Sequence, residues 1–95
     1  MADSATGATR IGLSQVVAYT GTQGVIANPV GAGTRMVRVT LSTAGHVAIG
    51  VTPVASTSTA YMPANWPEYF TINPGEKVSA LQVAAGGNLH VTEVS

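Results

Sequence analysis

The segment Thr34 to Leu41, TRMVRVTL, carries the clearest structural pattern in this chain of 95 residues. Its apolar side chains recur at a period of two residues, which is the spacing that separates the two faces of a β-strand. Val37, Val39 and Leu41 fall on one face of the predicted strand, and we expect that face to lie against a core. The opposite face carries Met36, Arg38 and Thr40.

Similar signals recur on both sides of this segment. Runs rich in Val, Ile and other strand-forming residues, bounded by Gly, Pro, Asn, Ser and Thr, predict further short strands. They cover residues 13–19, 23–28, 45–51, 68–72, 77–84 and 88–94. The sequences STAG at 42–45 and Gly86-Gly87 predict hairpins between their flanking strands. Asn73-Pro74-Gly75-Glu76 predicts a type II turn, because Pro occupies its second position and Gly its third.

These segments predict an all-β fold. About seven or eight short antiparallel strands with turns every 8 to 12 residues are typical of a single small β-sandwich or jelly-roll-like barrel. Residues 1–12 are small and polar and show no periodicity. We therefore predict a flexible N-terminal arm over residues 1–12 and one β-sandwich domain over residues 13–95.

The composition is poor in charge. Only 8% of the residues are charged and the formal net charge is zero, whereas an ordinary globular protein has about 25% charged residues. Without a basic field, nucleic acid is not expected as a partner. No apolar run reaches the length of a membrane helix, and no membrane association is expected. The absence of cysteine excludes disulfides and thiolate metal sites.

Few side chains are available for catalysis or metal binding. His46 and His90, with a carboxylate such as Glu93, would form a metal site only if the fold assembled them, because their spacing carries no metal-binding signature. The alternative is that both histidines are ordinary surface or interface residues. The chain also lacks a nucleophile elbow and a phosphate-binding glycine loop. We therefore predict no catalytic residue, no bound metal and no cofactor.

All but one of the aromatic residues lie between positions 60 and 70. One interpretation is that Tyr61, Trp66 and Tyr69 project as anchors for a partner, since Trp and Tyr are enriched among interface hot spots. The alternative is that they fold back and plug one end of the sandwich. Stacking on a sugar is a third possibility. Phe70 is expected to join the core.

Four segments of the C-terminal half carry a recognisable pattern: His46–Ala55, Tyr61–Phe70, Phe70–Val78 and Gly86–Glu93. They read as x-V-x-I-G-x-x-P-x-A, a stretch with prolines and aromatics, F-x-[IV]-x-P-G-E-K-[VI], and G-G-x-[LV]-x-V-T-E. In these features the chain resembles small virion proteins of tailed bacteriophages. The resemblance implies a capsid decoration or cement protein with a jelly-roll-like sandwich that forms trimers on the head shell.

This resemblance sets the functional expectation. The protein would be made in the host cytoplasm, reside on the capsid surface of the virion, and bind the major capsid protein without performing chemistry. The apolar and threonine-rich sides of the strands are expected to form the trimer interface, while the arm becomes ordered on the capsid. The expected partner contacts are Tyr61, Trp66, Tyr69, Arg10 and Ile11. Alternatives are a phage lectin-like module that binds surface glycans, and a structural component of the neck or tail.

Overall fold

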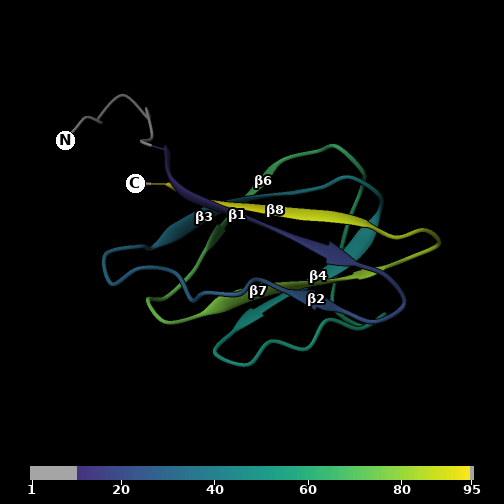
Figure 1. The fold of residues 1–95 in the computed structure, drawn as a ribbon, viewed down its shortest axis with the longest axis horizontal. Coiled ribbons are helices and arrows are strands. Elements are labelled where there is room, and N and C mark those ends of the chain that lie inside the picture. The colour runs from purple at the N-terminus through teal and green to yellow at the C-terminus, as the bar shows by residue number, and fades with distance from the viewer. Residues whose placement is uncertain (1–10, 95) are drawn as a thin grey trace.

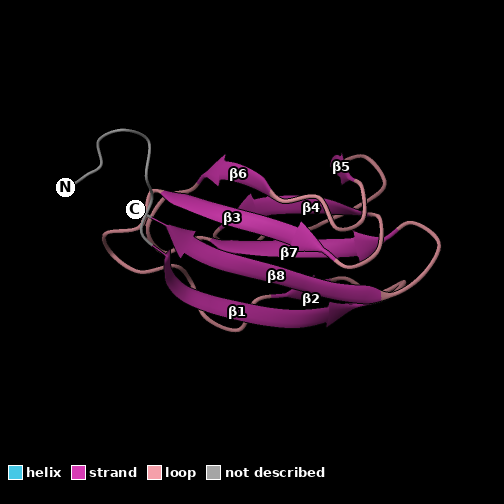
Figure 2. Cartoon of the chain, turned by 90° about the horizontal axis from the view of Figure 1, so that it is seen from above, coloured by secondary structure: helices cyan, strands magenta, loops and turns pink. Residues whose placement is uncertain are grey.

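The computed structural model describes residues 11–94, which form eight β-strands and no helix. The strands make two antiparallel four-stranded sheets that pack face to face, so the predicted all-β sandwich is confirmed (Figures 1 and 2). Sheet A contains, in spatial order, β1 (Ile11–Tyr19), β8 (Gly87–Val94), β3 (Met36–Leu41) and β6 (Glu68–Thr71). Sheet B contains β2 (Gly24–Val25), β7 (Lys77–Gln82), β4 (Gly45–Gly50) and β5 (Ala60–Met62).

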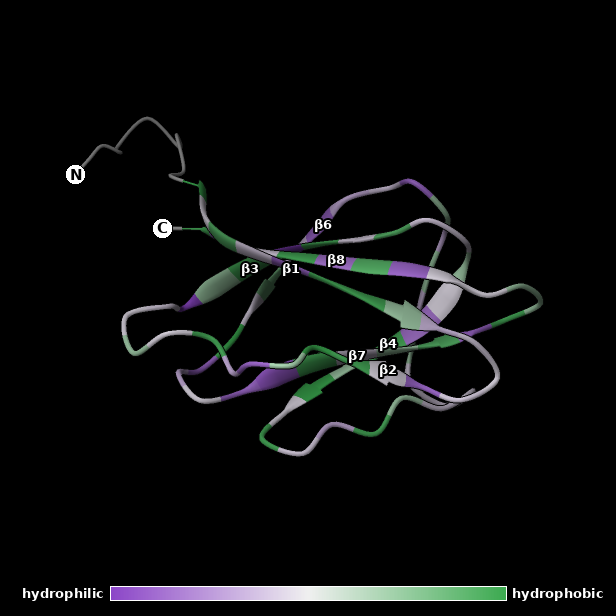
Figure 3. Cartoon of the chain, viewed as in Figure 1, coloured by the Kyte–Doolittle hydropathy of each residue, from purple (hydrophilic) through white to green (hydrophobic). Residues whose placement is uncertain are grey.

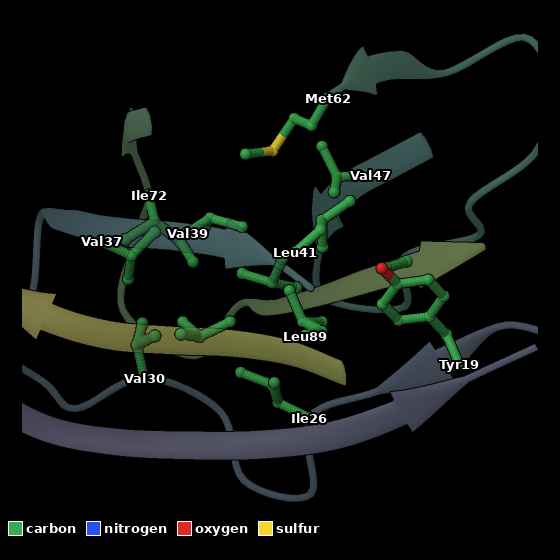
Figure 4. Packing of buried hydrophobic residues seen from close by; sticks show 13 residues of the cluster. Tyr19, Ile26, Val30, Val37, Val39, Leu41, Val47, Met62, Ile72 and Leu89 are labelled. Atoms are coloured by element: carbon green, nitrogen blue, oxygen red, sulfur yellow. The ribbon is translucent and has the colours of Figure 1, made fainter. Parts of the chain in front are cut away.

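Strand β3 has the orientation that its period-two pattern predicts. Val37, Val39 and Leu41 are fully buried between the two sheets, within a cluster that includes aliphatic side chains from both (Figure 4). Its neighbour β8 also alternates between hydrophilic and hydrophobic residues (Figure 3), and it buries Leu89 and Val91. Burying each such aliphatic side chain stabilises the fold by about 1.5–3 kcal/mol. The alternate residues of both strands therefore form the outer face of sheet A.

The predicted hairpins at 42–45 and 86–87 are wrong. β3 pairs with β8 and β6, β4 pairs with β7 and β5, and β7 and β8 belong to different sheets. Among the described strands, every connection between consecutive strands except β4–β5 crosses from one sheet to the other. Each of these turns therefore arches between the sheets, so consecutive strands contribute to opposite walls of the core.

The two arches at 42–44 and 83–86 lie side by side and bond to each other. The hydroxyl of Thr43 donates to the carbonyl of Ala85 (2.9 Å), and the amide of Val83 donates to the carbonyl of Ala44 (3.3 Å). Beneath them the buried hydroxyl of Tyr19 donates to the Thr43 carbonyl and accepts from the Thr43 amide. These contacts satisfy backbone groups that a hairpin would otherwise pair, which is why arches replace hairpins here.

Other boundaries differ less from the expectation. The type II turn is confirmed, since Gly75 has a φ of 88° and the Glu76 amide donates to the Asn73 carbonyl (3.1 Å). β1 begins at Ile11, two residues before the predicted start of the domain, and the rest of the predicted arm lies outside the described residues. The short strand β5 was not predicted, because the prolines that follow it obscure its pattern.

Candidate functional site

Part of the outer face of sheet B is covered by the protein's own chain. The long β4–β5 loop, residues 51–59, runs beneath sheet B on the side opposite sheet A (Figure 1). Gln23, next to β2 at the far edge of the sheet, holds this loop by donating from Nε2 to the Pro53 carbonyl (3.2 Å) and accepting from the Ala55 amide (2.6 Å). Pro53 and Ala55 are buried, as is the outward-pointing Ser79. The loop therefore closes the part of this face around Ser79, whereas Tyr61 at the β5 edge stays exposed.

The outer face of sheet A is open and hollowed. A hollow of about 400 Å³ lies over β1, β8 and β3, and we call it the sheet A hollow. It is lined by Ser14, Gln15, Val16, Arg38, Thr40, Ser42, Asn65, His90 and Thr92. Among exposed side chains on this face are Val16 and Tyr69, with 59% and 52% of their surfaces accessible. Because it is the accessible sheet face and is concave, the sheet A hollow is the candidate functional site.

Strand register assembles the hollow from residues far apart in sequence. Ser14 of β1 lies opposite Thr92 of β8, Thr92 lies opposite Arg38 of β3, and Arg38 lies opposite Tyr69 of β6. A second row runs from Val16 through His90 to Thr40. Directly opposed side chains on one face have Cβ atoms about 4.5–5.5 Å apart, so each row forms a continuous strip of side chains.

The lining consists of hydrogen-bonding groups and one positive charge. Hydroxyls come from Ser14, Thr40, Ser42 and Thr92, an amide from Asn65, and an imidazole from His90. The side-chain amide of Gln15 is instead bonded to the backbone of Asn28. The hydroxyls of Ser14 and Thr92 bond to each other at 2.9 Å. Arg38 is the one formally charged side chain of the lining, and within residues 11–94 no Asp or Glu lines the hollow. The site is thus equipped to hold an acceptor-rich or anionic group.

The β5–β6 connection, residues 63–67, provides one rim of the hollow. The amide of Asn65 donates to the carbonyl of Leu41 (2.7 Å), which fixes this connection to the end of β3. Asn65 has a φ of 57°, a left-handed conformation that Asn tolerates better than most residues. The turn places Asn65 in the lining and leaves the next residue, Trp66, 63% exposed.

The structure separates the aromatic residues that the sequence groups together. Trp66 and Tyr69 are exposed at the sheet A side, which excludes the interpretation that they plug the sandwich. Tyr61 is also exposed, but it lies on β5 of sheet B, where its ring packs edge-on against His46 at a centroid distance of 5.9 Å. Phe70 is half-buried and packs against the core, as expected.

The other expected contacts are Ile11 and Arg10. Ile11 is 68% exposed at the start of β1, and Leu13 and Val16 of the same strand are also exposed. Arg10 lies outside the described residues. Three of the five expected contact residues, Ile11, Trp66 and Tyr69, therefore belong to sheet A or its rim.

His46, His90 and Glu93 are not brought together. His46 and His90 point from the outer faces of different sheets, and the Nδ1 atom of His46 lies 2.9 Å from the carbonyl of Thr59. The Glu93 carboxylate accepts hydrogen bonds from the Thr34 hydroxyl and, at 3.3 Å, from the Gly31 amide. Within residues 11–94 no group of three His, Asp or Glu side chains is arranged to hold a metal ion.

None of the nine residues that line the hollow was predicted as a partner contact, and His90 was considered as a site residue only for metal binding. The available signal was the polar alternate face of the strands, visible as Arg38 and Thr40 within the segment 34–41. That signal marks an outer face, but it does not show which strands lie beside one another.

Comparison of the chain with protein-family models, with curated protein sequences and with solved structures finds no match. In the part of the chain that the structure describes, no helix has the length and apolar character needed to cross a membrane. The open face of sheet A is therefore the basis for assigning a function.

Proposed function

We propose that this protein is a non-enzymatic structural protein of a tailed-phage virion, a decoration protein that binds the assembled head shell through the open face of sheet A. The observation that carries this proposal is the asymmetry of the sandwich. Gln23 ties a loop over the outer face of sheet B, whereas the outer face of sheet A is hollowed and accessible. We infer that the face left open by this arrangement, that of sheet A, is the docking face.

The residue types on this side suit a protein interface. Arg38, Trp66 and Tyr69 belong to the three residue types most enriched among interface hot spots. Around them lie small hydroxyl-bearing residues with little side-chain entropy to lose on binding. Few ions must be desolvated when the face is covered, and desolvation of unpaired ions opposes association. The major capsid protein is the partner that this role requires.

A decoration protein stabilises its shell by mass action. Binding to the assembled lattice and not to its separated subunits adds the binding free energy to the cost of opening the lattice. Trimerisation multiplies this effect, because three linked docking faces bind with greater avidity than one. Two exposed apolar residues at the start of edge strand β1, Ile11 and Leu13, supply the proposed contact between protomers.

Immunogold electron microscopy tests the virion role. Antibodies against the protein are applied to particles of the phage whose genome carries the gene, with particles of a deletion strain as the control. The expected result is label distributed over the heads. Label confined to the neck or tail would replace the decoration role with the neck or tail alternative. Particles that carry no label and no peptides of the protein by mass spectrometry would overturn the proposal.

Sedimentation velocity tests the oligomeric state separately. A trimer is expected at micromolar protein concentration, and replacing Leu13 with Ser is expected to weaken it because Leu13 is 73% exposed. A monomer throughout this concentration range would contradict the trimer while leaving the open face of sheet A as a docking surface.

Glycan binding is the second candidate. The observation that favours it is that two exposed aromatic residues are neighbours of lining residues: Trp66 follows Asn65 in the chain, and Tyr69 lies opposite Arg38. Sugar rings stack on aromatic faces while polar groups bind their hydroxyls. A glycan-array signal that disappears in the variant Trp66→Ala would support this function over the decoration role.

A further inference from the structure

We propose that the sheet A hollow binds a carboxylate from an acidic segment of the docked partner protein, with Arg38 as its charged ligand. This inference rests on the proposed docking role of the open face. It assigns a chemistry to the centre of that face, where Arg38 lies on β3 between Thr92 of β8 and Tyr69 of β6.

The argument starts from the isolation of the Arg38 charge. Its side chain is half-buried, and no carboxylate of residues 11–94 lines the hollow. Two glutamates are engaged elsewhere: Glu93 binds Thr34 and Gly31, and Glu76 accepts from the Asn73 amide at 2.9 Å. Glu68 lies opposite Val39, at an inward-facing position of sheet A. The protein itself therefore does not neutralise Arg38 within its described part.

The missing counter-ion of Arg38 affects the free energy of docking. A partner that covers the hollow removes water from the guanidinium, and a desolvated charge without a counter-ion strongly opposes binding. A carboxylate on the partner removes this penalty, because the planar guanidinium can donate two parallel hydrogen bonds to its two oxygens. A partner with an amide or an aliphatic side chain at this point lacks that compensation.

The remaining lining can complete the site. Ser14 and Thr92 bond to each other, so one hydroxyl donates to the other and the second hydroxyl hydrogen remains available. Thr40 and Asn65 add further donors at the end of the hollow nearest the rim. An anion beside Arg38 would thus lie among hydroxyl and amide groups that can donate to it, and it would meet no carboxylate of the described residues.

The surroundings favour a protein segment over an acidic sugar. The exposed side chains of Tyr69 and Trp66 extend the contact area beyond the hollow, and Val16 adds apolar surface within it. Such a combination around a central Arg is typical of protein interfaces. An acidic glycan shares the carboxylate and is therefore the alternative that the experiment must separate.

The test is an NMR titration of the ¹⁵N-labelled full chain with three probes: acetyl-hexaglutamate amide, the matched hexaglutamine peptide, and 3′-sialyllactose. Hexaglutamate is expected to shift the amide signals of Arg38, Thr40 and Thr92 in a saturable way, with an affinity in the millimolar range that weakens as salt is added. Hexaglutamine is expected to leave these signals unchanged. Sialyllactose is expected to bind more weakly than hexaglutamate.

Variants assign the binding to Arg38. Arg38→Gln is expected to weaken hexaglutamate binding by roughly tenfold or more, and Arg38→Lys by less, because Lys keeps the charge without the planar fork. Arg35→Gln is the matched control, because Arg35 is exposed and does not line the hollow. The amide spectrum of each variant shows directly whether it is folded.

Several outcomes overturn the inference. The inference fails if hexaglutamate causes no saturable shift of the amide signals up to about 10 mM, or if hexaglutamine shifts them equally. It also fails if Arg35→Gln and Arg38→Gln weaken hexaglutamate binding equally, or if sialyllactose binds more tightly than hexaglutamate. Failure here is distinguishable from failure of the decoration role. Labelled heads combined with a silent titration would mean that the face docks without a carboxylate, whereas unlabelled virions would remove the decoration role whatever the titration shows.

Discussion

The amide of Ala55 donates a hydrogen bond of 2.6 Å to Oε1 of Gln23, and this contact joins the β4–β5 loop to the opposite edge of sheet B. The same side chain donates from Nε2 to the carbonyl of Pro53 at 3.2 Å. One glutamine thereby satisfies a backbone donor and a backbone acceptor of a loop that contains several small polar residues. The loop is held over sheet B, and the two outer faces of the sandwich become different.

Replacing Gln23 with Ala is therefore expected to loosen the loop. The change leaves the Pro53 carbonyl and the Ala55 amide without their partners, which we expect to lower the free energy of unfolding by about 1–2 kcal/mol. Urea denaturation measures that loss, and hydrogen exchange at the Ala55 amide should accelerate. Gln23→Glu keeps the acceptor for Ala55 but sets a carboxylate oxygen against the Pro53 carbonyl, so this variant is also expected to be destabilised. Unchanged exchange at Ala55 in Gln23→Ala would contradict this role.

Gly24 marks a close approach between strand β1 of sheet A and strand β2 of sheet B. A Cβ atom at this position would collide with the carbonyl oxygen of Ala18 and lie 2.9 Å from its carbonyl carbon. Both are backbone atoms, so the strands would have to separate. We expect Gly24→Ala to destabilise the protein by more than about 2 kcal/mol in thermal or urea unfolding.

Gly33→Ala is the matched control, because a Cβ atom there would meet nothing within 4 Å. We expect no loss of stability in this variant, and a gain of up to about 1 kcal/mol through reduced freedom of the unfolded chain. Equal destabilisation by the two substitutions would show that the close approach of Gly24 to Ala18 is not the cause of the loss of stability.

Ser79 carries a polar group that the fold leaves unpaired. Its side chain is fully buried beneath the β4–β5 loop, and its hydroxyl has no hydrogen-bond partner among the described residues. Ser79→Ala removes this group with almost no change in volume, and we expect the free energy of unfolding to rise by about 1 kcal/mol. Ser58→Ala, at an exposed position of the same loop, should leave it unchanged. Destabilisation by Ser79→Ala would mean that the hydroxyl is bonded after all.

The sequence predicts local structure in this protein better than it predicts pairing. The alternation in segment 34–41 specifies which side chains β3 buries, and Pro74-Gly75 specifies a turn whose backbone geometry few other residues adopt. Whether a short turn closes a hairpin or arches between sheets depends on distant partners. Here the backbone of Thr43 bonds to the hydroxyl of Tyr19, which is distant in sequence, and the turn forms an arch.

The same limit applies to the candidate site. Arg38 is recognisable from the sequence as an outward-facing residue, but its neighbours Thr92 and Tyr69 follow only from the order and register of the strands. The aromatic segment divides for the same reason. Its β5–β6 connection crosses between the sheets, so Tyr61 faces outward from sheet B and Tyr69 from sheet A.

Because Trp66 and Tyr61 lie on different sides of the sandwich, their substitutions are expected to differ in their effect on docking although their exposures are similar. Trp66 is 63% exposed beside the hollow, and Tyr61 is 57% exposed on the other sheet. Trp66→Ala should change the free energy of unfolding by no more than about 0.5 kcal/mol, and Tyr61→Ala by no more than about 1 kcal/mol through its lost contact with His46.

Their effects on docking should differ. If the open face of sheet A binds the head shell, Trp66→Ala should weaken the binding of fluorescently labelled protein to heads of the deletion strain by about 30-fold or more, which corresponds to the loss of a hot spot of about 2 kcal/mol. Tyr61→Ala should bind as tightly as the unmodified protein, because its ring lies on the far sheet. Loss of binding in Tyr61→Ala with retention in Trp66→Ala would place the docking surface on sheet B and refute the assignment made here.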